Sequence, residues 1–230
     1  MSGQRSAPAP SLLEAIDAFE RGDFRAARTG LEAAATRQDP VAITYLAMLI
    51  WMGKGGLKAN PAQAVGLFRK AAEAGLASAQ VNLALAYLHG AGVPQDDREA
   101  RHWFDEAAHR RAPAGLFYLG EFAASGRGEQ QNPTKARELW SKAAERGYAP
   151  AMRAFGAACA DGRGGPADAI DGLAWLYAAA AGGEADAATS ARFLAERMRA
   201  KDITLAHKRG KALAKRFARA APWADEPIAR

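Results

Sequence analysis

The sequence predicts an all-α fold, a right-handed α-solenoid of helix-pair repeats, and three observations lead to this prediction. Glycines recur at a spacing of 36 to 37 residues, apolar residues follow a period of 3.6 rather than 2, and small residues return at matching places in each period. One helix pair alone buries too little apolar surface to offset its ordering cost. We therefore expect several stacked pairs, with polar outer faces on the two terminal units.

The first pair is expected over residues 11–38, after a flexible N-terminus at residues 1–10. Ser11 and Glu14 match a capping box, in which two side chains bind the free amides at a helix start. Asp23 is placed to cap the next helix, and Ala27 and Leu31 repeat the spacing of the later second helices. This pair is therefore predicted as a divergent N-terminal unit.

Four further repeats are expected over residues 39–187. Two glycines mark the loop of each repeat, and they are Gly53 and Gly55, Gly90 and Gly92, Gly126 and Gly128, and Gly162 and Gly164. Six or seven residues after the first glycine stands an Asn or Asp that can cap a helix, namely Asn60, Asp96, Asn132 and Asp168. An Ala-Ala pair and two bulky residues then share one helical face, which permits close helix packing.

Three of the second helices are expected to end at a glycine in the left-handed conformation. These glycines are Gly75, Gly147 and Gly183, whereas Arg111 occupies the same place in the second repeat. Because a side chain disfavours this conformation, the cap at Arg111 is predicted to be weaker.

This pattern resembles the Sel1-like repeat family, which is related to the tetratricopeptide repeats. Residues 87–108 follow the family pattern closely, and the resemblance covers about residues 39–187. Departures are Ile50, Ala123 and Cys159 at the aromatic position, an extra glycine at Gly56, and Gly172 where Ala is expected. The resemblance implies a non-enzymatic adaptor or scaffold that binds another protein or a peptide in a concave groove.

The resemblance also implies which residues bind the partner, because tetratricopeptide-like solenoids present exposed positions of each first helix. Counted from the recurrent Leu, these positions are Tyr45, Leu49, Met52, Asn82, Leu85, His89, Tyr118, Glu121 and Phe122. Exposed aromatic side chains among polar groups are typical of a binding hot spot. The alternative is that Tyr118 and Phe122 pack between repeats.

The C-terminal part, residues 188–221, is predicted to hold basic capping helices, followed by a tail at 222–230. A helix over about 202–221 carries an apolar stripe of Ile203, Ala206, Gly210, Leu213 and Phe217, which is expected to dock on the last repeat. Residues 197–230 contain ten Lys or Arg and three Asp or Glu, so the basic charge of the chain is concentrated here. An alternative function is that Lys208, Arg209, Lys211, Lys215, Arg216 and Arg219 bind nucleic acid or an anionic membrane surface.

Catalysis, cofactors and small-molecule substrates find no support in the sequence. The four histidines lack a metal-binding spacing, and the lone Cys159 falls at a core position, where a buried thiol is expected. No nucleophile, base and orienting group can be assembled.

The chain is expected to be cytoplasmic, because the N-terminus lacks a secretory signal and no apolar stretch reaches the roughly 20 residues of a membrane span. The excess of Arg over Lys and the abundance of Ala favour a bacterial source. A regulatory, envelope-assembly or toxin-immunity role is expected.

Overall fold

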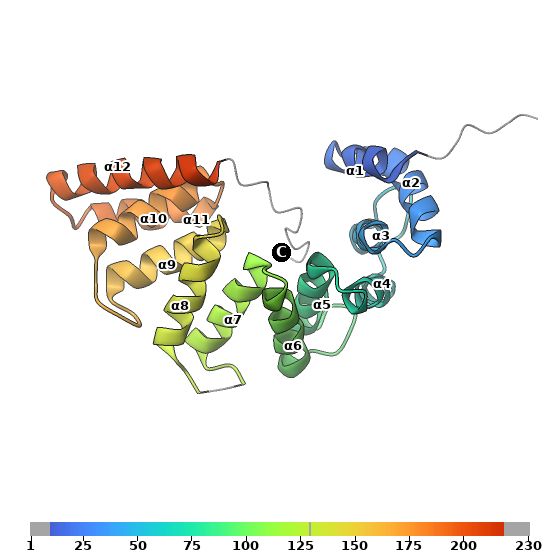
Figure 1. The fold of residues 1–230 in the computed structure, drawn as a ribbon, viewed down its shortest axis with the longest axis horizontal. Coiled ribbons are helices and arrows are strands. Elements are labelled where there is room, and N and C mark those ends of the chain that lie inside the picture. The colour runs from blue at the N-terminus through green and yellow to red at the C-terminus, as the bar shows by residue number, and fades with distance from the viewer. Residues whose placement is uncertain (1–9, 129, 219–230) are drawn as a thin grey trace, which may run out of the picture. The chain divides into compact units, whose positions relative to one another are not determined.

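A computed structural model describes residues 10–128 and 130–218, and every regular element in these ranges is an α-helix (Figure 1). The predicted all-α class is therefore confirmed. The predicted flexible N-terminus lies, except for Pro10, outside the described residues. In chain order the helices are α1 (Leu12–Glu20), α2 (Phe24–Thr36), α3 (Pro40–Met52), α4 (Pro61–Glu73), α5 (Ala77–His89), α6 (Asp97–His109), α7 (Pro113–Ser125), α8 (Pro133–Ala144), α9 (Ala149–Asp161), α10 (Ala169–Ala181), α11 (Ala185–Ala195) and α12 (Ala200–Phe217).

The chain forms two compact units, which divide within α6 after Ala100. In the first unit each helix from α1 to α4 packs on the next, up to α5 (Figure 1). Its N-terminal core joins Ala15 of α1, Leu31 of α2 and Leu49 of α3, and the ring of Phe19 meets that of Tyr45 edge to face at 5.0 Å. The predicted N-terminal pair is thus packed on the first repeat.

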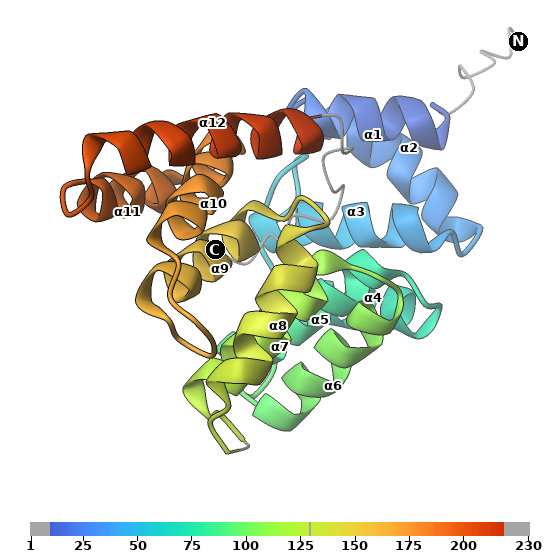
Figure 2. The ribbon, with the colours of Figure 1, turned by 60° about the vertical axis from the view of Figure 1, so that its left-hand side comes forward.

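In the second unit, α7 to α10 pack in sequence, and α11 and α12 both pack on α10. Figure 2 shows α12 lying along α10. Ala206 and Gly210 of α12 are buried in this contact, where a Cβ at Gly210 would come within 2.7 Å of the Cβ of Tyr177. The prediction that the apolar stripe docks on the last repeat is therefore confirmed.

The C-terminal helices differ from the prediction in their bounds. Helix α12 begins at Ala200 and ends at Phe217, and residues 219–221 of the predicted helix lie outside the described residues. The sequence pattern does not predict α11 as a separate helix, because its alanine-rich sequence shows little of the 3.6-residue spacing of apolar residues. Its buried residues are Ala187 and Ala191.

The predicted helix starts are confirmed. Side chains of Asn60, Asn132 and Asp168 each accept a hydrogen bond from the backbone N–H three residues later, at 2.9 to 3.1 Å. Asp96 accepts hydrogen bonds from the backbone N–H groups of Arg98 and Glu99. Ser11 and Glu14 form the reciprocal capping box. These bonds satisfy amides that a helix start leaves without a partner inside the helix.

The paired loop glycines have two different tasks. The first of each pair, such as Gly90, ends a first helix in the left-handed conformation. The second allows close approach of the preceding repeat in some loops, since a Cβ at Gly92 would lie 2.5 Å from the carbonyl carbon of Pro61, and Gly164 faces Pro133 in the same way. Gly128 has the left-handed conformation but no described atom within 4 Å of an added Cβ, so the glycine period reflects backbone conformation in every loop and close contact only in some.

Among the described residues, two other than glycine also adopt the left-handed conformation. Arg111 has φ 66°, as the alignment with Gly75 and Gly147 predicts, and Gln38 has φ 63° at the equivalent place after α2. The four second helices from α2 to α8 therefore end in the same way, with glycine at only two of them.

Candidate protein-binding surface

The first-helix residues that we predicted to face a partner from α3 are largely buried. Tyr45 is 9% exposed and Leu49 is fully buried. The reason is that α3 packs between α2 and α4, so that neighbouring helices cover it on two sides. The prediction that these two side chains are exposed is wrong, and Met52, at the end of α3, is half-buried.

The predicted residues on α5 are also mostly buried. Leu85 is fully buried and Asn82 is 5% exposed, within a run in which every residue of 78–86 is buried. Because these buried residues lie all around the helix, this part of α5 has no side exposed to water. The amide Nδ2 of Asn82 donates to the Ser78 carbonyl at 3.1 Å, and the predicted exposure of Asn82 and Leu85 is wrong. His89 is exposed.

On α7, the two predicted aromatic residues pack within the protein. Phe122 is 3% exposed, and the half-buried ring of Tyr118 stacks on Phe104 with 4.6 Å between ring centroids. The predicted exposure of Phe122 is wrong. The alternative, in which Tyr118 and Phe122 pack between repeats, is the arrangement found, since both rings contact Phe104 of the preceding repeat. Glu121, which lies between them on α7, is exposed.

Glu121 lies in a crowded polar environment. Desolvation raises the pKa of its carboxyl group, although the charges of Arg153 and Arg163 and the indole N–H of Trp140 partly oppose this shift. Trp140 Nε1 is buried and forms no hydrogen bond of normal geometry among the described residues. Glu121 is exposed as a whole residue, but its carboxyl group is partly desolvated by the protein around it.

Charged side chains of both signs continue from Glu121 across α9 to α11. Arg153 Nε donates to Glu184 Oε1 at 3.0 Å, and Arg163 pairs with Asp161 at 3.3 Å. Helix α9 contacts both α7 and α11. We call these five residues, Glu121, Arg153, Asp161, Arg163 and Glu184, the polar strip. The carboxylates of the strip can accept hydrogen bonds from the N–H groups of a peptide backbone, and its arginines can donate to the carbonyl groups. Both kinds of residue can also form ion pairs with charged side chains.

Sequence reasoning found Glu121 and missed Arg153. The first-helix positions predicted to face a partner do not include Arg153. A usable signal was present, because Arg153 is the single charged residue in the alanine-rich range 149–160.

The basic residues predicted on the last helix are exposed where the structure describes them. Lys208, Arg209, Lys211, Lys215 and Arg216 lie on the faces of α12 away from the buried Ala206 and Gly210, and Arg219 lies outside the described residues. Arg209 approaches Asp171 of α10 at 3.8 Å.

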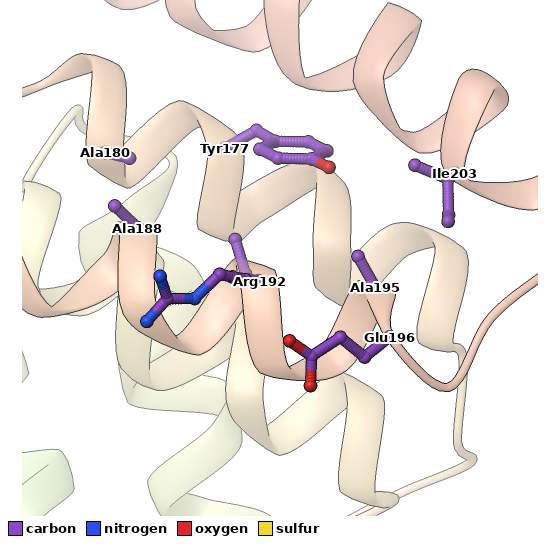
Figure 3. A pocket seen from close by; sticks show the side chains of 8 residues that line it. Tyr177, Ala180, Ala188, Arg192, Ala195, Glu196 and Ile203 are labelled. Atoms are coloured by element: carbon purple, nitrogen blue, oxygen red, sulfur yellow. The ribbon is translucent and has the colours of Figure 1, made fainter. Parts of the chain in front are cut away.

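A pocket that the sequence analysis did not identify lies between α10, α11 and α12, with a volume of about 520 Å³. Figure 3 shows the Tyr177 ring of α10 at the gap between α11 and α12, with Arg192 and Glu196 extending from α11. Alanines of α10 and α11 and Ile203 of α12 complete the lining. The walls are therefore largely apolar.

Cys159 is a packed residue, as predicted. It is 2% exposed, burial raises the pKa of its thiol, and Arg137 Nη2 lies 3.4 Å from its sulfur. Within the described ranges, His, Cys, Asp and Glu side chains form no cluster of three or more that could hold a metal ion. None of the described helices combines the length and apolar character needed to cross a membrane.

Comparison with known proteins identifies the repeats. The Sel1 repeat model matches residues 40–76, 77–110, 113–148 and 149–184, which is more than half of the chain. No curated protein sequence matches the chain.

Solved structures share the fold. A Sel1 repeat protein from Oxalobacter formigenes is 25% identical, with 87% of this chain and 82% of that chain covered and a TM-score of 0.71. A protective antigen present in uropathogenic Escherichia coli strains, which displays an SLR fold, is 22% identical over 90% of this chain and 53% of its own, with a TM-score of 0.60. A sel1 repeat protein from Klebsiella pneumoniae is also 22% identical, over 80% and 91%, with a TM-score of 0.55.

Proposed function

Because the chain belongs to the Sel1 repeat family, whose repeats generally mediate contacts between proteins, we propose that it is a non-enzymatic adaptor that binds a protein or peptide along the polar strip. Members of this family are generally non-catalytic scaffolds. The observation that supports this site is the exposed but poorly hydrated carboxylate of Glu121, beside Arg153.

The physical argument is that a partner replaces the hydration that Glu121 lacks. A cationic side chain or a backbone N–H placed on this carboxylate would form a charge-assisted hydrogen bond, which is stronger than a bond between neutral groups. Arg153 and Arg163 offer donors to the carbonyl groups of the same segment. A partner that presents both kinds of group in an extended segment fits the strip.

This adaptor is proposed to act in a bacterial cytoplasm, in a regulatory, envelope-assembly or toxin-immunity system. The bacterial sources of the similar solved structures and the single cysteine of the chain support this placement.

The test begins with affinity purification and mass spectrometry to identify the partner, followed by titration of purified partner into chain variants. Glu121→Gln and Arg153→Gln are each expected to weaken binding by about tenfold, as for charged contacts near the centre of an interface. Glu73→Gln, an equivalent change at an exposed residue of α4, is the matched control. If both strip variants bind the partner as tightly as the unaltered chain, the polar strip is not the binding surface.

A further inference from the structure

The last helix pair is packed differently from four of the earlier pairs. In α1–α2, α3–α4, α7–α8 and α9–α10 the two helices of a pair pack closely on each other. Helices α11 and α12 instead both pack on α10, with at most marginal contact between them. The interface that closes those four pairs is therefore open in the last one.

The pocket of about 520 Å³ occupies this opening (Figure 3). Ala188, Ala191 and Ala195 of α11 leave it wide because their side chains are short, while Tyr177 and Ile203 supply larger apolar surfaces. The volume is within the range of about 300 to 1,000 Å³ for ligand pockets, and it can hold a large apolar side chain with part of its backbone.

Polar groups occur at the edge of the pocket. Arg192 and Glu196 both extend from α11 beside it, and no ion pair or hydrogen bond joins either of them to another described side chain. An arginine donates to carboxylates and carbonyl oxygens, and a glutamate accepts from backbone N–H groups. Together they suit a peptide whose apolar side chain enters the pocket.

The surroundings of the pocket are strongly basic. Residues 185–217 contain nine Lys or Arg and three Asp or Glu. Of the three acidic residues, Asp202 forms an ion pair with Arg199 at 2.8 Å, and Glu196 lines the pocket. Lys201, Lys208 and Lys215 follow a seven-residue spacing along the outer side of α12 and form no ion pair with other described residues. This surface therefore attracts a negatively charged partner.

We propose that the α11–α12 pocket binds an acidic segment of a partner protein, which inserts one large apolar side chain, places a carboxylate near Arg192 and is attracted by the positive charge of α12. A protein segment fits the pocket better than a membrane does, because the apolar lining of the pocket, unlike the exposed Phe193 and Leu205 on the same helices, is recessed between two helices. It also fits better than nucleic acid, because the pocket walls are largely apolar and a phosphate backbone has no apolar group to place between them. This docking surface is separate from the polar strip and does not depend on the function proposed for it.

The proposal is tested with a labelled probe peptide, Asp-Glu-Asp-Ala-Phe-Ala-Asp-Glu-Asp, whose binding to the full chain is measured by fluorescence anisotropy at about 150 mM salt. Ala188 is an exposed residue that lines the pocket, so the larger side chain in Ala188→Leu would fill part of it. This variant is expected to bind the probe at least about tenfold more weakly. Ala212→Leu adds the same group on the outer side of α12 and is expected to have little effect. Replacing the Phe of the probe by Ala is expected to lower affinity as much as Ala188→Leu.

The charge requirement is tested in the same assay. Arg192→Gln is expected to reduce affinity by severalfold, whereas Arg25→Gln, an equal change at an exposed residue of the first unit, is expected to leave it unchanged. Thermal melting of each variant separates lost binding from lost folding.

Any of the following results would overturn the proposal. The probe fails to bind at millimolar concentration, binds equally well without its Phe, or binds equally well to Ala188→Leu. A DNA duplex of about 20 base pairs, or phosphatidylcholine vesicles with about 30% phosphatidylserine, bind where the probe does not. The probe binds only after Trp223, in the tail at 222–230, is replaced by Ala, which would mean that the chain's own C-terminal segment, and not a partner, occupies the pocket.

Discussion

The indole ring of Trp140 lies directly against the Cα of Gly120, so that a Cβ added at Gly120 would come within 2.6 Å of Trp140 Nε1. This contact joins α7 to α8 in the third repeat. Glycine is required here by the close approach and not by an unusual backbone angle, because Gly120 lies within α7.

Gly120→Ala is therefore expected to destabilise the protein by about 1 to 3 kcal/mol, despite the better helix propensity of alanine, because the added methyl group displaces the indole ring. Gly66→Ala is the control, since Gly66 also lies within a helix but has no atom within 4 Å of an added Cβ. That control is expected to gain up to about 1 kcal/mol. Urea denaturation measures both, and equal effects of the two changes would contradict the packing explanation.

The left-handed residues after α2 and α6 provide a second test. Arg111→Gly and Gln38→Gly are each expected to stabilise the fold by about 0.5 to 1 kcal/mol, because glycine adopts φ near 65° without the steric cost of a Cβ. Glu145→Gly is the control, since Glu145 ends α8 at φ −63°, and its replacement is expected to destabilise. Thermal unfolding of the three variants measures the sign of each change.

The pH dependence of stability is expected to reveal the environment of Glu121. Its pKa is raised, chiefly by desolvation, so the ionised form is less favourable in the folded chain than in the unfolded chain. The protein therefore loses stability through Glu121 as pH rises from the ordinary carboxyl range through the raised pKa. Glu121→Gln is expected to melt above the unaltered chain at pH 7, with the difference shrinking toward pH 4.

Glu138 is the opposite control. A hydrogen bond from Lys142 at 2.6 Å lowers the pKa of this carboxyl group. Its contribution to stability is present above the ordinary carboxyl pKa and is lost as pH falls, so Glu138→Gln is expected to melt below the unaltered chain at pH 7. If the two variants change in the same direction with pH, the assignment for Glu121 is wrong.

The capping role of α12 is tested at Phe217, whose ring lies 6.1 Å from that of Trp175 on α10. Phe217→Asp is expected to destabilise the second unit by about 2 kcal/mol, because a carboxylate would replace apolar packing at a half-buried position. Hydrogen exchange is expected to accelerate in α10 (Ala169–Ala181) and to stay unchanged in α5, since repeats couple mainly to their neighbours.

Exposed lysines of the same helix provide the control for that experiment. Replacing Lys211 and Lys215 by Gln leaves the buried side of α12 intact and is expected to alter melting little, because isolated surface charges contribute little to stability. If the lysine variant unfolds while Phe217→Asp remains protected, α12 is not held by its apolar stripe.

Signals between residues close in the sequence predicted much of the fold. The capping side chains at Ser11, Asn60 and Asp168 act on amides within three residues, and the left-handed position of Arg111 depends on the backbone beside it. The period of the glycines then aligned successive repeats, and the stripe of α12 predicted its docking on the last one. These features need no knowledge of which helix lies opposite.

Exposure at the candidate sites was decided by the tertiary structure. Whether Tyr45 or Asn82 meets water depends on the helices that cover α3 and α5, and no residue near them in the sequence carries that information. The pocket beside Ala188 depends on how α11 and α12 each settle on α10. Helix formation is governed mainly by hydrogen bonds between residues close in the sequence, and the sequence by itself therefore determined the repeats. A binding surface consists of the side chains that packing between distant segments leaves exposed, and only the tertiary structure could determine it.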